Sequence, residues 1–140
     1  MNFAALSKLM YDEDGIIKAV ELAPNGVVRS VYPQASNADA LELNMLRHPE
    51  RKVEASLAKE SGQYTIAGSF QLVQGGTGAL LFDPIYTTGA DGSQKYWGFS
   101  VLVLDWESFL DEIQINKLQD ASYEYLIWKE GHNGERIVIA

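Results

Sequence analysis

The sequence predicts an α+β domain in which helices pack over one face of an antiparallel sheet. The expected elements run in the order helix, hairpin, two helices, three strands, helix and further strands. Such runs of strands joined by tight turns, with helices clustered between them, are typical of α+β folds. At 140 residues, the chain is long enough for one hydrophobic core. We therefore expect residues 1–140 to form a single domain.

The N-terminal third predicts a helix followed by a hairpin. Apolar residues recur at helical spacing in Phe3–Met10. Ile16–Leu22 and Val27–Tyr32 are rich in β-branched residues, which favour strands. The turn residues Pro24-Asn25-Gly26 separate them, and Pro33 ends the second strand.

Two helices are expected next. Asn37–Leu46 carries Ala40, Leu41 and Met45 on one helical face, and His48-Pro49 ends it. Glu50–Lys59 is the second helix, with Gly62 as a C-terminal cap in the left-handed conformation.

Three strands follow, at Tyr64–Val73, Ala79–Tyr86 and Tyr96–Leu104. The turn Gln74–Gly78 joins the first two, and the polar loop Thr87–Gln94 joins the last two. Because Tyr96–Leu104 is almost continuously apolar, we expect it at the centre of the sheet.

The C-terminal part predicts one helix and two short strands. Asp105 is a favourable N-cap for a helix. Further strands are expected at Tyr123–Trp128 and Arg136–Ile139. The apolar stripe of the helix comprises Trp106, Phe109, Leu110 and Ile113.

Charge and composition exclude several classes of function. Eleven Lys and Arg residues against nineteen Asp and Glu residues give a formal net charge of −8. Because nucleic-acid binding requires cations that displace counterions, we expect no nucleic-acid partner. The absence of Cys excludes disulfides, thiolate nucleophiles and Cys-ligated metals. We expect neither a signal peptide nor a membrane span within this sequence.

The residues needed for catalysis do not form a recognisable pattern. His48 and His132 stand apart in polar contexts, without the clustered ligands that a metal requires. Gly75-Gly76-Thr77-Gly78 lacks the Lys-Ser/Thr of a phosphate loop and joins two strands. No Gly-x-Ser-x-Gly elbow is present. We expect no enzyme activity, metal or cofactor; a small hydrolase with cryptic carboxylates is the remaining catalytic alternative.

Two local features remain open to a structural or a binding interpretation. Asp83 interrupts an apolar strand, and its side chain either points outward by alternation or points into a ligand cavity. Gly98 lies between aromatic residues in a strand, which indicates a bulge or a close approach by backbone or ligand. Its aromatic neighbours line either an apolar pocket or the core.

Several motifs in order resemble those of the CHASE domain family. The resemblance extends from about Phe3 to Trp128. It rests on Ile17–Val28, Val31-Tyr32-Pro33, Asn37, Pro49, Arg51, Ala58–Gly62, Gln74-Gly75-Gly76-x-Gly78, Pro84-Ile85-Tyr86, Trp97-Gly98-Phe99 and Leu104-Asp105.

The resemblance implies a non-catalytic sensor on the periplasmic or extracellular side of a membrane. It implies a PAS-like fold with a small-molecule cavity between an antiparallel sheet and its helices. The parent protein would then be a transmembrane receptor with a histidine kinase, diguanylate cyclase or phosphodiesterase output, and the sequence would be an excised part of it. The flanking helices of such a receptor would allow a homodimer.

Some residues depart from the family pattern near the expected pocket. Plant members carry an acidic residue near the position of Asn44, and that residue holds the base of a cytokinin. Ala67 and Ser69 replace a common Thr or Ser and a common Pro. The resemblance therefore implies a ligand other than a cytokinin.

Two hypotheses for function follow. The first is a sensor that binds a small molecule and biases its flanking helices. The alternative is a ligand-free module for dimerisation or partner docking, which predicts an exposed apolar patch. For the sensor, the expected ligand-binding residues are Asn44, Met45, Tyr64, Ile66, Ala67, Phe70, Leu81, Asp83, Tyr96, Gly98 and Phe99.

Overall fold

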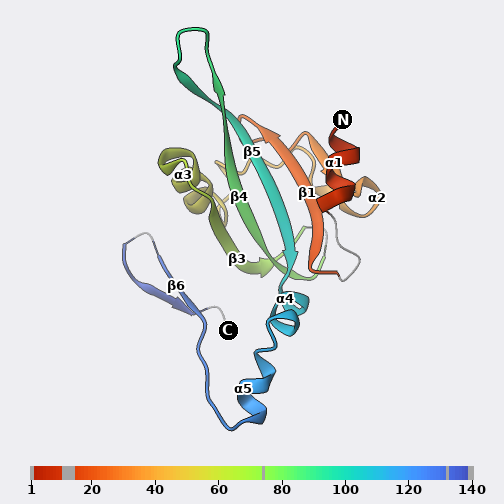
Figure 1. Cartoon of the computed structure of the whole chain (residues 1–140), viewed down its shortest axis with the longest axis vertical. Coiled ribbons are helices and arrows are strands. Elements are labelled where there is room, and N and C mark those ends of the chain that lie inside the picture. Colours follow the sequence, from red (N-terminus) through yellow and green to blue (C-terminus); the bar gives the residue numbers. More distant parts are fainter. Residues whose placement is uncertain (1, 11–14, 74, 132, 139–140) are drawn as a thin grey trace.

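A five-stranded antiparallel sheet forms the centre of the protein (Figure 1). The computed structural model describes residues 2–10, 15–73, 75–131 and 133–138. The strand order is β2-β1-β5-β4-β3, so the apolar strand β5 is central as predicted. The strands are β1 (Ile17–Pro24), β2 (Ser30–Tyr32), β3 (Thr65–Gln71), β4 (Thr77–Thr88) and β5 (Gln94–Asp105).

A separate two-stranded hairpin and several short helices complete the chain. The hairpin consists of β6 (Trp128–Glu130) and β7 (Arg136–Val138). Among the described residues, no helix combines the length and apolar character required to cross a bilayer. The helices are α1 (Phe3–Met10), α2 (Gln34–Asn37), the 3-10 helix η1 (Ala38–Ala40), α3 (Lys52–Ser61), α4 (Trp106–Glu112) and α5 (Asn116–Asp120).

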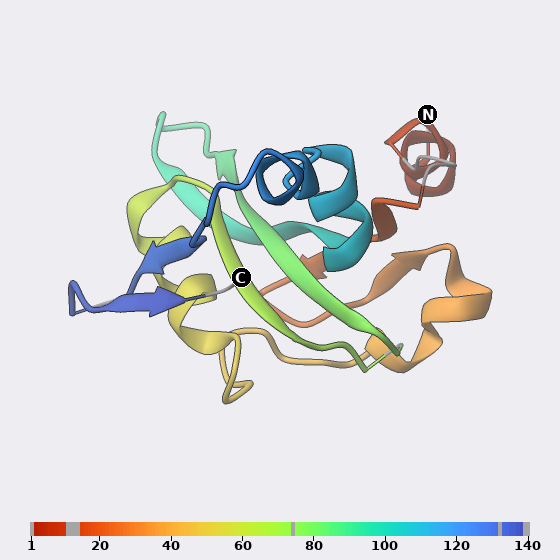
Figure 2. The same ribbon diagram turned by 90° about the horizontal axis from the view of Figure 1, so that it is seen from below.

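The two faces of the sheet have different covers. Figure 2 shows α3 on one side of the sheet and α4 with α5 on the other. We call the side that carries α3 the inner face and the opposite side the outer face. The β6–β7 hairpin lies beside α3, at the edge formed by β3. The α+β class with an antiparallel sheet is therefore confirmed, and a second layer on the outer face is added to it.

The hydrophobic core lies between the inner face and α3. Side chains alternate along each strand, so every second residue of β4 and β5 points into this core. Phe82 and Phe99 are fully buried there, with ring centroids 5.4 Å apart. Ala55 and Ala58 of α3 are also fully buried, and their small size brings the helix close to the sheet.

Gly98 allows β5 to approach β1 closely. A Cβ at this position would overlap the carbonyl oxygen of Ala23 and would lie 2.7 Å from the Cα of Pro24. The pairing of β4 with β5 also shifts between Ile85 and Tyr86, next to this glycine. The sequence prediction of a close approach is confirmed, and the neighbour is backbone.

The predicted helix Asn37–Leu46 is wrong beyond residue 40. The chain is helical only to Ala40, and Glu42 adopts a positive φ of 67°. Residues 42–45 instead hydrogen-bond to residues 26–28, where Val28 N donates to Leu43 O at 2.9 Å. These long-range backbone bonds replace the local helical bonds that the apolar spacing predicted.

The C-terminal segment also differs from expectation. The predicted strand Tyr123–Trp128 is wrong, because β6 begins only at Trp128. The short helix α5 was not predicted. Two predicted caps are confirmed, since Gly62 has φ 72° and Asp105 accepts a hydrogen bond from Ser108 N. The predicted positions Gln74, His132 and Ile139 lie outside the described residues.

Candidate ligand-binding site

The outer face carries an apolar hollow of about 570 Å³. Its floor is the sheet, and one wall is α4. The opposite rim is formed by α3 and by the C-terminal segment, which contributes Ile127, Lys129 and Glu130. A volume of this size is in the range of small-molecule sites. The lining residues are Glu54, Leu57, Tyr64, Thr65, Ile66, Leu81, Leu104, Trp106, Phe109, Ile127, Lys129 and Glu130.

Strand alternation explains the floor of the hollow. Ile66 of β3 pairs with Leu81 of β4, so both side chains point away from the core. Leu104 of β5 pairs with Ala79 and points to the same face. Ile66, on the edge strand β3, remains 45% exposed. The floor therefore offers apolar surface to a ligand.

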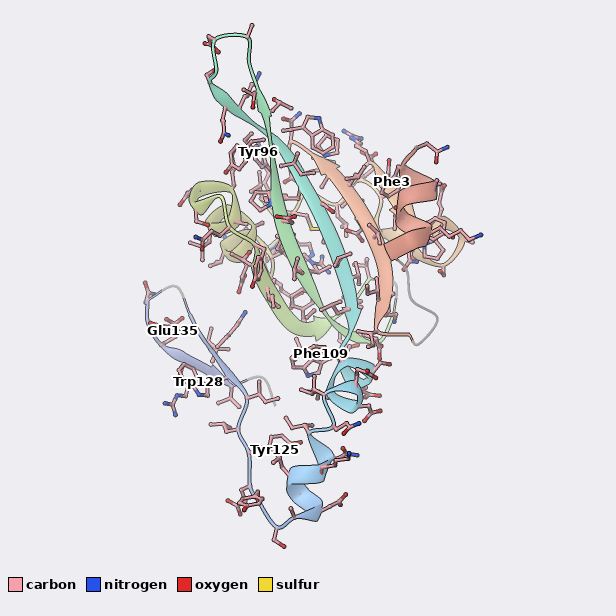
Figure 3. The ribbon with its side chains drawn as sticks, in the orientation of Figure 1. Phe3, Tyr96, Phe109, Tyr125, Trp128 and Glu135 are labelled. Atoms are coloured by element: carbon pink, nitrogen blue, oxygen red, sulfur yellow. The ribbon has the colours of Figure 1, made fainter. Side chains whose placement is uncertain are left out.

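Two aromatic residues of α4 form the wall. Asp105 ends β5 and caps α4, because its Oδ2 accepts hydrogen bonds from Ser108 N at 3.0 Å and from Ser108 Oγ at 2.7 Å. Trp106 and Phe109 then follow at helical spacing, and their rings stack with centroids 5.5 Å apart. Figure 3 places Phe109 at the end of the sheet opposite Tyr96.

The environment of Asp105 keeps its carboxylate ionised. Burial alone raises the pKa of this carboxyl, but the two hydrogen bonds from Ser108 and the charge of Lys18 outweigh it. The pKa of Asp105 is therefore lowered from its ordinary value. The ionised form is also the better cap for the N-terminus of α4.

One ion pair closes the rim between α3 and the C-terminal hairpin. Lys129 Nζ of β6 lies 2.6 Å from Glu54 Oε1 of α3. Both side chains are partly buried, at 24% and 21% exposure. Thr65 Oγ1 donates to Glu54 O at 2.7 Å, so the same residue of α3 is also anchored to β3. The rim is thus held by polar contacts around an apolar interior.

The lining of the hollow suits the binding of a hydrophobic molecule. Its walls are mainly aliphatic and aromatic, which suits a hydrophobic molecule. Among the described residues, no group of three His, Asp or Glu side chains is placed to hold a metal ion. The polar residues on the rim are engaged with each other or exposed.

The structure brings three of the residues predicted to bind ligand into this hollow. Tyr64, Ile66 and Leu81 all line it. Asp83 is on the same face of the sheet but is exposed and does not line the hollow. Its outward orientation agrees with the alternation-based interpretation.

The other predicted residues lie on the inner face or in turns. Met45, Ala67 and Phe99 are buried in the core. Phe70 packs against the core beneath Arg51, whose guanidinium carbon lies 5.0 Å from the ring centroid. Gly98 contacts the β1 backbone as described above.

Asn44 serves the turn that replaces the predicted helix. Its Oδ1 accepts a hydrogen bond from Leu46 N at 3.1 Å, and its backbone bridges to Val27. Tyr96 is half-buried, and the centroid of its ring lies 5.3 Å from that of Phe99. The ammonium group of Lys59 of α3 lies over the Tyr96 ring. Burial and, to a lesser degree, Tyr86 raise the pKa of Tyr96. The predicted set is therefore divided between the two faces.

Two buried charged residues in the core were not indicated by the sequence. Arg51 is 2% exposed and Glu21 is 1% exposed, both on the inner side of the sheet. Burial lowers the pKa of the Arg51 guanidinium, and the Glu21 carboxylate opposes this shift. Nε and Nη1 of Arg51 have no hydrogen-bond partner among the described residues. The helical pattern gave no indication that Arg51, which precedes α3, points inward.

Sequence reasoning also missed much of the hollow. The sequence indicates Trp106 and Phe109 only as part of a helical stripe, and Glu54 only as a residue of the predicted helix Glu50–Lys59. Ile127 and Lys129 belong to the C-terminal segment, whose position on the outer face is a tertiary property. Only the strong apolar character of Trp106-x-x-Phe109 could have indicated a binding surface.

Comparison with known proteins gives a family and a fold. Residues 14–138 match the CHASE domain family. None of the curated proteins matches the sequence significantly. An extracellular ligand binding receptor from Desulfohalobium retbaense DSM5692 has a similar structure, with a TM-score of 0.59 and 17% identity. The match covers 89% of this chain and 21% of that receptor chain, so this chain corresponds to about a fifth of its length.

Proposed function

Because the chain belongs to the CHASE domain family, we propose that it is a sensor that binds a small molecule in the outer-face hollow. CHASE domains are extracytoplasmic sensory domains, and this domain is therefore periplasmic or extracellular. The proposal adds the place of binding and the route of the signal. It assigns no reaction to the domain.

The observation that carries the proposal is the composition of the hollow. Residues from β3, β4, β5, α3 and α4 and from the C-terminal segment all meet there around an apolar space of about 570 Å³. Tyr64, Ile66 and Leu81, which the sequence predicted as binding residues, contribute to it. Burying such surface against a ligand is favourable by about 25 cal/mol per Å² of apolar area.

The hollow also offers a route for the signal. Ile127 and Lys129 line it and belong to the segment that leads to the C-terminus. A ligand that prefers one position of this segment shifts its equilibrium by the difference in affinity between the two positions. We infer that ligand binding displaces the β6–β7 hairpin relative to α3, and that this displacement is the signal.

At the level of the whole receptor, the proposal includes flanking transmembrane helices. These would carry the signal to a histidine kinase, diguanylate cyclase or phosphodiesterase domain, and would allow a homodimer. The family match and the similarity in fold to an extracellular ligand binding receptor support the extracellular sensor part of this proposal. Sequencing the gene on both sides tests it, since apolar stretches of about 20 residues are expected there.

A thermal-shift screen tests the proposed binding site. A binder at 100 times its dissociation constant stabilises the fold by about 2.7 kcal/mol. The variant Leu81→Arg places a charge on the floor of the hollow and should abolish the shift. The matched control is Val73→Arg, at a 41% exposed position outside the hollow lining. Equal shifts in Leu81→Arg and wild type would contradict the proposal.

One observation favours a docking module as a second candidate. The C-terminal segment exposes large apolar side chains, with Tyr123 at 66%, Leu126 at 53% and Val138 at 56%. Exposed apolar side chains mark an interaction surface where they form a contiguous patch. This function predicts concentration-dependent dimers by light scattering and no thermal shift with any small molecule.

A further inference from the structure

The hollow combines an apolar interior with charges that neutralise each other at its rim. We propose that it selects an uncharged hydrophobic molecule with a flat ring, and that Glu54 and Lys129 set this charge specificity. This inference rests on the proposed function, because it concerns the ligand class of the same site.

The shape of the walls favours a flat ring. Trp106 and Phe109 stack with an interplanar angle of 28°, and together they present an aromatic wall. Ile66 and Leu81 form an aliphatic floor opposite the solvent. Aromatic side chains contribute large contact areas and favour stacked or edge-to-face partners.

The opposite charges of Lys129 and Glu54 at the rim neutralise each other. Lys129 Nζ and Glu54 Oε1 are 2.6 Å apart and both side chains are about three-quarters shielded from solvent. A charged ligand would lose part of its hydration and would find each opposite charge already paired. An uncharged ligand avoids this cost and still gains the apolar contacts.

The remaining rim charge does not change this balance. Glu130 lines the rim but is exposed, so solvent screens its carboxylate. In the β6–β7 register it stands opposite Arg136, whose guanidinium carbon lies 4.4 Å from the ring centroid of Trp128. Glu130 is therefore not expected to set the charge preference of the hollow.

Three probes of one ring system test the inference. Indole is uncharged, tryptamine carries an ammonium group, and indole-3-acetate carries a carboxylate. Their affinities for the folded domain can be measured by NMR titration at neutral pH and physiological salt. For the wild type we expect indole to bind at least about fivefold more tightly than either charged analogue. The charge of each analogue finds no free partner at the rim, because Glu54 and Lys129 are already paired.

Breaking the ion pair from either side should change the preference in opposite directions. Lys129→Met leaves the Glu54 carboxylate unpaired, and tryptamine should gain about two- to fivefold relative to indole. Glu54→Gln leaves the Lys129 ammonium unpaired, and indole-3-acetate should gain similarly. Glu60→Gln, at an exposed position of α3 outside the hollow lining, should leave both ratios unchanged. Circular dichroism checks that each variant is folded.

The outcomes separate this inference from the proposed function. If indole binds and Leu81→Arg abolishes binding, the site stands. If a charged analogue then binds as tightly as indole, or if the two variants do not shift the preference oppositely, the charge specificity is wrong while the site remains. If none of the three probes binds at any soluble concentration, the ligand class inferred here is wrong, and the thermal-shift screen with Leu81→Arg decides separately whether the hollow binds another small molecule.

Discussion

Lys129 Nζ of β6 lies 2.6 Å from Glu54 Oε1 of α3, and this pair joins residues 75 positions apart. It connects the C-terminal hairpin with the helix that covers the core. Glu54 and Lys129 both line the outer hollow, whereas Ala55 and Ala58 of the same helix pack against the inner face. Helix α3 is therefore shared between the core and the candidate site.

Breaking this pair should release the hairpin without unfolding the domain. For Lys129→Met we expect a loss of global stability of no more than about 1 kcal/mol, because the pair is partly exposed. Amide hydrogen exchange of residues 128–130 and 136–138 should become faster, while exchange in β4 and β5 stays unchanged. Unchanged exchange in the hairpin would mean that the pair does not hold it.

Removal of the α4 cap should destabilise the wall of the hollow in a pH-dependent way. Asp105→Ala should cost about 1 kcal/mol near pH 7, as is typical for an N-cap. Because the folded-state pKa of Asp105 is lowered, its stabilisation is present above the ordinary carboxyl pKa of about 4. It is lost as the pH falls through the folded-state value.

Urea unfolding of Asp105→Ala and wild type at several pH values measures this difference. The difference in free energy of unfolding between the two proteins should disappear below about pH 4. Asp83→Ala is the matched control, since this carboxylate on β4 is exposed and should change stability by less than about 0.5 kcal/mol. A gap that persists undiminished in acid would show that the Asp105 charge is not the stabilising feature.

The buried charges of Arg51 and Glu21 should be strongly coupled. Arg51→Leu removes the guanidinium that interacts with the Glu21 carboxylate, and should cost about 3 kcal/mol or more. The double variant Arg51→Leu/Glu21→Leu should recover much of this loss, because no buried charge then remains. A double-mutant cycle by urea unfolding measures the coupling, and purely additive losses would argue against it.

Gly98 should tolerate no side chain. Gly98→Ala forces a Cβ against the backbone of Ala23 and Pro24 in the neighbouring strand, so a loss of about 3 kcal/mol or more is expected. Gly89→Ala in the β4–β5 loop is the comparison, because its added Cβ meets side-chain atoms of Asp91 and Ser93 that can move. Similar midpoints of thermal unfolding for the two variants would contradict this account of the β1–β5 approach.

The sheet could be predicted from the sequence because its signals are local. Apolar and β-branched runs bounded by turn residues located β1, β3, β4 and β5, and the continuous apolar run placed β5 at the centre. The segment 41–46 could not be predicted in this way, because its backbone bonds are made to residues 26–28. Apolar spacing alone cannot distinguish a helix from a segment held by such distant partners.

The candidate site was predictable only in part for the same reason. Strand periodicity separates Ile66 and Leu81 from Ala67 and Phe99, but it does not say which set faces a ligand. That depends on where α4 and the hairpin pack. Lys129 meets Glu54 through tertiary structure, and no spacing in the sequence indicates this contact.

The most direct test of the account is a methyl NMR titration of the domain with indole. The outer-face methyl groups of Ile66 and Leu81 and the inner-face methyl groups of Val101 and Val103 report separately on the two sides of the sheet. We expect saturable shifts at Ile66 and Leu81, with the Val101 and Val103 signals little changed. Shifts concentrated at Val101 and Val103 would place the ligand beneath α3, and would contradict binding in the outer-face hollow.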